Sequence, residues 1–264
     1  MKKIKKAIIK DKIIVELEQI EENYIEVLDK VSFENATDVE IDLNILKEHV
    51  ERKIRKFHFY EIYKGIEFYK RYKDALKGIK INLDEIEKHN FSFGYSVLIL
   101  KVFKDLELLD ENGLERIRKL VEKSLDYGYD FHNKFKELLS YGERDLAIKL
   151  MKKVILYFCN KPFFENEINE TFTNALRNGI ESTDFLDALH VVEIIYSNNL
   201  ESLFEKEIEM LREKIYKALR GYNYGLILSL KSMLTSEYYK RFGMIILKIL
   251  NDESLKRKLI EYLI

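Results

Sequence analysis

Amphipathic periodicity is clearest in Leu146-Ala-Ile-Lys-Leu-Met-Lys-Lys-Val-Ile-Leu-Tyr-Phe158, where apolar side chains recur every three or four positions. This spacing places them on one face of a helix. A short break follows, and a more polar helix is expected from Glu165 to Arg177. The pair Asn178-Gly179 would end that second helix, because glycine adopts the left-handed conformation that closes many helices. The stretch therefore predicts a helix pair.

The same order of elements then repeats. An apolar helix is expected from Phe185 to Tyr196, followed by a break at Ser197-Asn198-Asn199. A charged helix is expected from Leu203 to Leu219, closed at Arg220-Gly221. The chain from Asp145 to Gly221 thus predicts two successive pairs, each made of an apolar helix, a break, a more polar helix and a glycine.

The segments on either side of these two pairs also show helical periodicity. Before them, an apolar helix, a break at Asp110 to Gly113 and a charged helix closed at Tyr127-Gly128 form one more pair, and an extra helix follows. After them we expect a further pair and a final short helix. The predicted helices are Tyr95 to Leu109, Leu114 to Leu125, Asp130 to Leu139, Gly225 to Leu234, Glu237 to Leu250 and Glu253 to Tyr262.

The glycines that close the pairs are Gly128, Gly179 and Gly221, which lie 51 and 42 positions apart. Spacing of roughly 40 residues per helix pair resembles the α-solenoid class of armadillo and HEAT arrays. The resemblance covers Ser92 to Leu250, and it implies a mainly α fold of stacked antiparallel helix pairs. It implies no family function, because the usual repeat prolines and arginines are missing. An irregular helical bundle would give the same pattern.

Residues 1–43 differ from the rest, and we expect them to form a small N-terminal element of β character, with a helical repeat domain at 44–264. Two β-branched runs flank Lys10-Asp11-Lys12 within Ala7 to Leu17, as in a hairpin. Thr37 to Leu43 alternates polar and apolar side chains, the pattern of a half-buried strand. A helix through Ile13 to Leu28 is the competing interpretation.

Helical spacing begins after Asn44. Leu46, Val50, Ile54 and Phe57 share one helical face, and the pattern can continue toward Leu76, with Gly78 as its end. A short helix that reaches Lys88 could be capped by Asn82 or Asp84.

Composition limits the class of protein. Of 264 residues, 47% are apolar and 34% charged, with a net charge of −1, so the chain can bury a core and has no global attraction for nucleic acid or an anionic membrane. One cysteine, Cys159, excludes a disulfide framework. The chain has no signal-peptide pattern and no apolar run long enough to span a membrane, so we expect a soluble, cytoplasmic protein. Heavy use of Lys, Glu, Ile and Tyr beside a single glutamine is typical of thermophile proteins.

Motifs for catalysis, for a cofactor or for a metal are missing, so we expect no cofactor and no metal site. Gly221-Tyr-Asn-Tyr-Gly225 has two glycines but no lysine after them, and we interpret it as a hinge between repeats. Cys159 follows an apolar helix without a neighbouring base, which favours a buried thiol.

One helix carries a polar cluster in which Asp184, Asp187, His190 and Glu193 recur every three residues. A metal or acid–base role would require two or three of them to converge with a group from another part of the chain. The alternative is a polar edge on an apolar helix, with Asp184 near the helix N-terminus. The remaining histidines are scattered singly, without metal-ligand spacing.

Charges are segregated along the first third of the chain. Residues 13–51 contain twelve acids and two lysines, whereas residues 52–80 contain ten bases and three acids. The basic stretch also carries aromatic rings, a combination that binds single-stranded nucleic acid by stacking and phosphate contacts. Alternatively, the rings are core residues and the bases pair with the acidic stretch. The candidate nucleic-acid-binding residues are Lys64, Tyr69, Lys70, Arg71, Tyr72, Lys73 and Lys77.

These observations favour a non-enzymatic helical scaffold that binds a protein partner, since solenoids expose long binding surfaces. Nucleic-acid binding through residues 52–80 is the alternative hypothesis. An enzyme with a site around Asp187 and His190 is the weakest of the three. A scaffold predicts an exposed apolar or aromatic surface, a nucleic-acid-binding protein predicts unpaired cations at the candidate positions, and an enzyme predicts converging titratable groups in a pocket.

Overall fold

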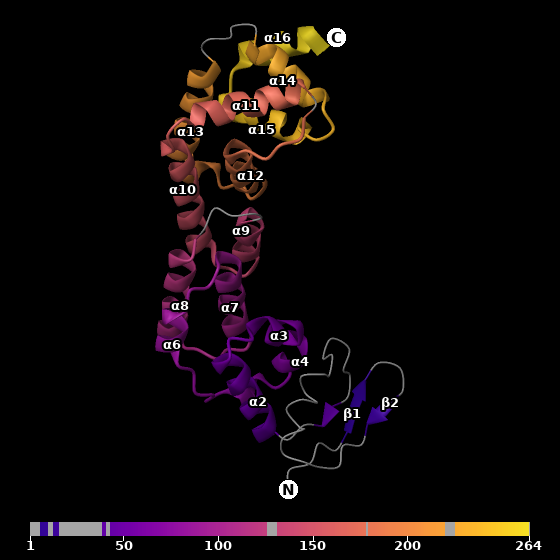
Figure 1. Cartoon of the computed structure of the whole chain (residues 1–264), viewed down its shortest axis with the longest axis vertical. Coiled ribbons are helices and arrows are strands. Elements are labelled where there is room, and N and C mark those ends of the chain that lie inside the picture. Colours follow the sequence, from indigo (N-terminus) through magenta and orange to yellow (C-terminus); the bar gives the residue numbers. More distant parts are fainter. Residues whose placement is uncertain are drawn as a thin grey trace. The chain divides into compact units, whose positions relative to one another are not determined.

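The computed structural model describes residues 6–9, 13–15, 39–40, 43–125, 131–177, 179–219 and 225–263. These residues are mainly helical, as the sequence predicts. The chain forms two compact units, Met1–Asp126 and Tyr127–Ile264 (Figure 1). The predicted boundary between residues 43 and 44 lies inside the first unit and stays a prediction, because most residues before it are outside the described part. None of the described helices is long and apolar enough to cross a membrane.

Three short strands are described near the N-terminus. β1 (Lys6–Ile9) lies between β2 (Ile13–Val15) and β3 (Val39–Glu40), and both pairings are antiparallel. Ala7 is opposite Val15 on one side and Val39 on the other. The segments that join the strands fall outside the described residues, so the small N-terminal element as a whole stays a prediction, as does the competing helix at Ile13 to Leu28.

The first predicted helix of this unit is broken in the structure. The expected continuous helix toward Leu76 is divided into four, and the later prediction of a short helix capped by Asn82 is confirmed. The helices are α2 (Leu43–Arg55), α3 (Phe59–Lys64), α4 (Ile66–Lys70), α5 (Lys73–Leu76), α6 (Leu83–Lys88), α7 (Phe93–Asp105) and α8 (Glu111–Lys123).

The first break lies at Phe57, which adopts a φ of +59°. The N–H of Phe57 bonds to the carbonyl of Ile54, and the N–H of His58 bonds to the carbonyl of Lys53. These two bonds form a Schellman motif, in which the left-handed residue is usually glycine. Because Phe57 occupies the glycine position, the helix end could not be recognised from the sequence.

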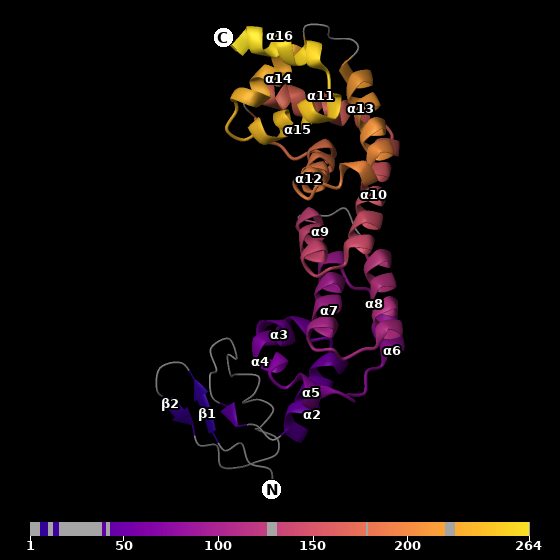
Figure 2. The same ribbon diagram turned by 180° about the vertical axis from the view of Figure 1, so that it is seen from behind.

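α7 and α8 lie side by side and antiparallel (Figures 1 and 2). Ser92 caps α7 by accepting a hydrogen bond from the N–H of Tyr95, and Asp110 caps α8 by accepting one from the N–H of Gly113 at 2.8 Å. Asp110 therefore starts the second helix, and Gly113 lies in its first turn rather than in the predicted break.

The second unit contains α9 (Phe131–Ser140), α10 (Arg144–Asn160), α11 (Phe164–Leu176), α12 (Asp184–Ser197), η2 (Glu201–Leu203), α13 (Glu205–Leu219), α14 (Gly225–Thr235), α15 (Lys240–Leu250) and α16 (Glu253–Leu263). α12 packs against α9, α10, α11 and α15. It buries apolar side chains on nearly every face, including Phe185 and Ile194. A helix that is apolar on nearly every face lies inside a core. The position of α12 among four helices therefore explains the apolar sequence from Phe185 to Tyr196.

Candidate functional site

The four polar residues of α12 do not form one site. Asp184 begins the helix and forms an ion pair with Lys161 from the turn after α10. Asp187 lies one turn further along and is half-buried. Burial disfavours its carboxylate and raises the pKa of Asp187 to about 6. Asp184 and Asp187 therefore do not show the convergence that a metal or acid–base role would require.

His190 and Glu193 do lie together, and they meet a histidine that the sequence did not connect with them. The ring of His132 from α9 stacks on the ring of His190 with centroids 4.2 Å apart and planes 3° from parallel. A guanidinium nitrogen of Arg241 lies 3.4 Å from Nε2 of His190, and Glu193 Oε2 lies 3.7 Å from Nδ1. Burial, His132, Arg241 and Lys136 lower the pKa of His190 to about 4.

These contacts define the protonation state of His190. Because a guanidinium can only donate, Nε2 of His190 is the acceptor, and the ring proton lies on Nδ1 facing Glu193. The lone pair that a general base would use is thus occupied by Arg241. Within the described part of the chain, no three histidine, cysteine, aspartate or glutamate residues are placed to hold a metal ion. The geometry fits a packing role for this histidine pair.

The predicted nucleic-acid-binding cations are mostly neutralised by carboxylates of the first unit. Lys70 lies 3.2 Å from Glu67 and 3.3 Å from Asp105. Lys73 pairs with Glu107, and Lys77 lies 2.5 Å from Asp74. The acidic partners are therefore different from the predicted ones in residues 13–51, most of which lie outside the described residues.

The other candidates divide between the core and the surface. Tyr69 is 1% exposed and its hydroxyl lies 3.1 Å from Nε2 of His49, so this ring is not available to a base. Tyr72 is half-buried and contacts Phe68. Arg71 is exposed, and Lys64 lies over the ring of Tyr60, with 4.7 Å between its ammonium and the ring centroid.

A different set of cations has no acidic partner within the part of the chain that the structure describes. Among the described residues, Arg55, Lys56 and Lys80 form no ion pair, although all three are exposed. Arg55 and Lys56 follow one another at the end of α2, and Lys80 precedes α6. An exposed cation that forms no ion pair within the chain can bind an anionic group of a partner, since no internal contact has to be broken first.

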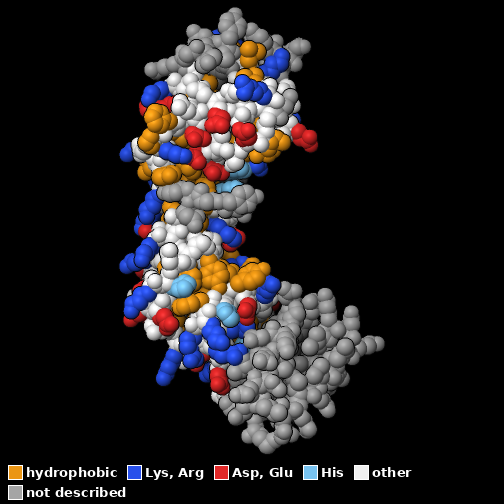
Figure 3. Space-filling model, viewed as in Figure 1, with side chains coloured by type: hydrophobic (Ala, Val, Ile, Leu, Met, Phe, Trp, Pro, Cys, Tyr) orange, Lys and Arg blue, Asp and Glu red, His pale blue; other side chains and the backbone are white. Residues whose placement is uncertain are grey.

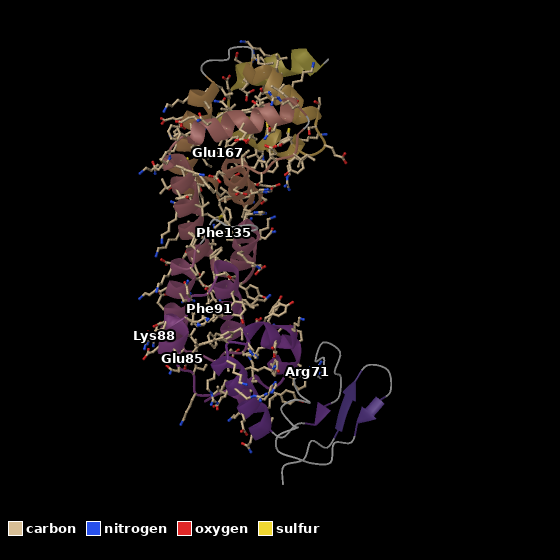
Figure 4. The ribbon with its side chains drawn as sticks, in the orientation of Figure 1. Arg71, Glu85, Lys88, Phe91, Phe135 and Glu167 are labelled. Carbon is tan, nitrogen blue, oxygen red and sulfur yellow. The ribbon has the colours of Figure 1, made fainter. Side chains whose placement is uncertain are left out.

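Two of these cations line a pocket with a cavity volume of about 170 Å³. Its apolar lining comes from buried Ile54 and Ile86 and half-buried Phe57. The complete lining is Glu51, Ile54, Arg55, Phe57, Lys80, Asn82, Glu85 and Ile86, and we call it the Phe57 pocket. Ile54, Arg55, Phe57 and Lys80 belong to the basic stretch at residues 52–80. Figure 4 labels Glu85 of the pocket and the exposed Arg71 on opposite sides of the helices in that view.

The turn that holds Phe57 is fixed by aromatic contacts. The ring of Phe57 stacks on exposed His89 at 4.6 Å and meets the edge of Phe91 at 5.5 Å. Phe91 in turn stacks on Tyr95 at 5.4 Å, and the Tyr95 hydroxyl donates a hydrogen bond to the carbonyl of Phe57. Aromatic pairs in these geometries add to the stability that burial gives, so the pocket is preformed.

An exposed aromatic ring adjoins this turn. Tyr60 on α3 is 53% exposed, three residues after Phe57, and Lys64 covers its ring. Hydrophobic, histidine and lysine or arginine side chains gather on the viewed face of the first unit (Figure 3). We define the Phe57 surface as the Phe57 pocket together with Lys56, Tyr60 and Lys64. Sequence reasoning selected Lys64 but missed the other cations, since their freedom from ion pairs depends on tertiary contacts.

Comparison with known proteins found no matching family model, no matching curated protein and no matching solved structure.

Proposed function

We propose that this chain is a non-enzymatic helical binding protein that holds a protein partner on the Phe57 surface. The observation that carries the proposal is the coincidence of a preformed pocket, an exposed tyrosine and three cations without acidic partners among the described residues. Tyrosine and arginine are enriched where binding energy concentrates in protein interfaces. The proposal includes the arrangement of the helices from α7 onward as stacked pairs, which would present such surfaces along the chain.

A protein partner fits this surface better than a nucleic acid does. Glu51 and Glu85 line the same pocket as Arg55 and Lys80, and Glu61 on α3 pairs with Lys53. Carboxylates interspersed among the cations would repel a continuous phosphate backbone. A protein surface of mixed charge can match both signs, and complementary charges set its orientation.

The test compares affinity capture by the wild-type chain and by two charge-reversal variants. Arg55→Glu with Lys56→Glu changes the Phe57 surface. Lys119→Glu with Lys123→Glu is the matched control, because both lysines are exposed on α8 and form no ion pair among the described residues. The proposal is supported if the wild type and the control retain a partner that the surface variant loses. The purified partner must also bind the wild-type chain again. A partner retained equally by both variants contradicts it, provided circular dichroism shows equal folding.

A further inference from the structure

We infer that Arg241 and Lys136 together bind a phosphate monoester group in the second unit, where α12 packs against both α9 and α15 (Figure 1). This site is separate from the Phe57 surface, and the inference does not depend on the proposed partner. Three observations carry it: how Arg241 is held, which second cation lies near it, and where the closest carboxylates lie.

Arg241 is held in place by neutral groups. Its guanidinium lies over the ring of buried Phe242, 4.6 Å from the ring centroid, and one guanidinium nitrogen lies 3.4 Å from Nε2 of His190. His190 is uncharged at pH 7, because its pKa is lowered to about 4. These contacts orient Arg241 but leave its positive charge in place, and a guanidinium has more N–H groups than the one that faces His190.

The second cation comes from another helix. Lys136 on α9 lies one turn after His132, whose ring stacks on His190. Burial lowers the pKa of His190, and the charges of Arg241 and Lys136 lower it further, so both cations act on the same ring. Both are exposed, and neither forms an ion pair within the described residues. α15 contains two further lysines and no acidic residue.

The closest carboxylates do not neutralise these cations. Oε2 of Glu193 lies 3.7 Å from Nδ1 of His190, whereas Arg241 contacts the other ring nitrogen. Asp187 is half-buried, and burial raises its pKa to about 6. A carboxyl group that was paired with Arg241 or Lys136 would have a lowered pKa instead. The charge that this surface offers to a ligand is therefore positive.

A phosphate monoester matches this arrangement. It carries about two negative charges near pH 7 and presents several acceptor oxygens. The planar guanidinium of Arg241 can donate two parallel hydrogen bonds to such a group, and the ammonium of Lys136 can contact a further oxygen. A carboxylate, with a single charge, would neutralise only one of the two cations. Because the cations belong to α9 and α15, the bound phosphate would also join these two helices.

The probe is a fluorescein-labelled peptide, Gly-Ser-Gly-Ser-Gly-Ser-Gly, phosphorylated on its central serine, titrated with the full chain at low salt and followed by anisotropy. The unphosphorylated peptide is the matched probe. Affinity for the phosphopeptide should fall about tenfold or more in Lys136→Gln with Arg241→Gln. The control, Arg257→Gln with Lys258→Gln, removes the same charges from exposed positions of α16 and should leave the affinity unchanged.

Folding of the variants is checked separately. Circular dichroism should show equal helix content in all of them. Arg241→Lys keeps the charge and loses the planar donor group, so its affinity should lie between those of the wild type and the double glutamine variant.

Competition with inorganic phosphate, against sodium chloride at equal ionic strength, distinguishes two sources of the phosphate group. Inorganic phosphate that displaces the peptide as well as unlabelled phosphopeptide does indicates a small phosphorylated molecule. Weaker displacement indicates a phosphorylated protein whose flanking residues also contribute. The inference is overturned if the phosphopeptide does not bind, if the unphosphorylated peptide binds equally well, or if the α16 control loses as much affinity as the double glutamine variant.

Discussion

The hydroxyl of Tyr95 bridges the two sides of the turn at Phe57. It donates a hydrogen bond to the carbonyl of Phe57 and accepts one at 3.2 Å from the backbone N–H of Phe59. These contacts connect α7 to the junction between α2 and α3, where Phe57 takes a φ of +59°. One side chain thus satisfies two backbone groups that the helix break leaves unpaired.

Replacing this tyrosine should weaken the first unit. Tyr95→Phe removes both hydrogen bonds and keeps the ring contacts, so the free energy of unfolding should fall by about 1–3 kcal/mol. Urea denaturation measures the change. Tyr60→Phe is the control, because the ring of Tyr60 is exposed, and its effect should stay within about 0.5 kcal/mol. Equal stability of the two variants would show that the bridge contributes nothing.

A second strained position lies in the other unit. Phe163 precedes α11 with a φ of +63°, and its side chain is 76% exposed. Because glycine adopts this conformation without a steric penalty, Phe163→Gly should raise the free energy of unfolding by about 0.5–1 kcal/mol. Phe163→Ala keeps the Cβ atom and should change stability by less. If thermal denaturation showed the glycine variant to be the less stable of the two, Phe163 would have to contribute contacts that outweigh its strain.

The half-buried carboxyl of Asp187 should destabilise the second unit at neutral pH. Its pKa is raised to about 6 in the folded chain from 3.8, so the folded state carries an unfavourable charge above pH 6, and this cost disappears as the pH falls toward 4. Asp187→Asn should therefore stabilise the protein at pH 7.5 by about 1–2 kcal/mol and have little effect at pH 4. Urea titrations at both values measure this, and a gain that does not depend on pH would contradict it.

His190 should act in the opposite direction. Its pKa is lowered to about 4 from 6.5, so the stability that its neutral ring contributes is complete above pH 6.5 and is lost as the pH falls toward 4. The groups around it are His132 and Lys136 on α9, Arg241 on α15, and Glu193 on its own helix.

The two opposite effects can be separated in the Asp187→Asn background. There, His190→Gln should flatten the loss of stability between pH 6.5 and 4.5 by about 1–2 kcal/mol. The unfolding midpoint in urea, measured across this range, provides the test. An unchanged slope would mean that another group causes the acid sensitivity.

Local sequence signals predicted most of the helices. Apolar periodicity found α10 and α12 to within two residues at either end, and Asn82 was recognised as a cap because its side chain suits that position. The ends at Phe57 and Glu107 were missed, since both residues occupy left-handed positions where the expected signal is glycine. Such exceptions depend on tertiary contacts like the one from Tyr95.

The candidate site was harder to predict, because it depends on which charges pair. Lys70 and Lys73 looked available in the sequence, but Asp105 and Glu107, more than thirty positions away, neutralise them. Arg55 and Lys80 were part of the same basic stretch, and nothing local indicated that they would form no ion pair with the residues that the structure describes. In the same way, the stack of His132 on His190 joins residues from two helices that are far apart in the sequence.

Site-specific photo-crosslinking tests most directly whether a partner binds the Phe57 surface. A photoreactive phenylalanine analogue would replace Tyr60 in one variant and Tyr238, an exposed tyrosine of the second unit, in another. The account predicts that the analogue at position 60 crosslinks a protein partner, that the analogue at position 238 does not, and that Arg55→Glu with Lys56→Glu abolishes the product. A partner that crosslinks equally from both positions, or a product that survives the charge reversal, would contradict the account.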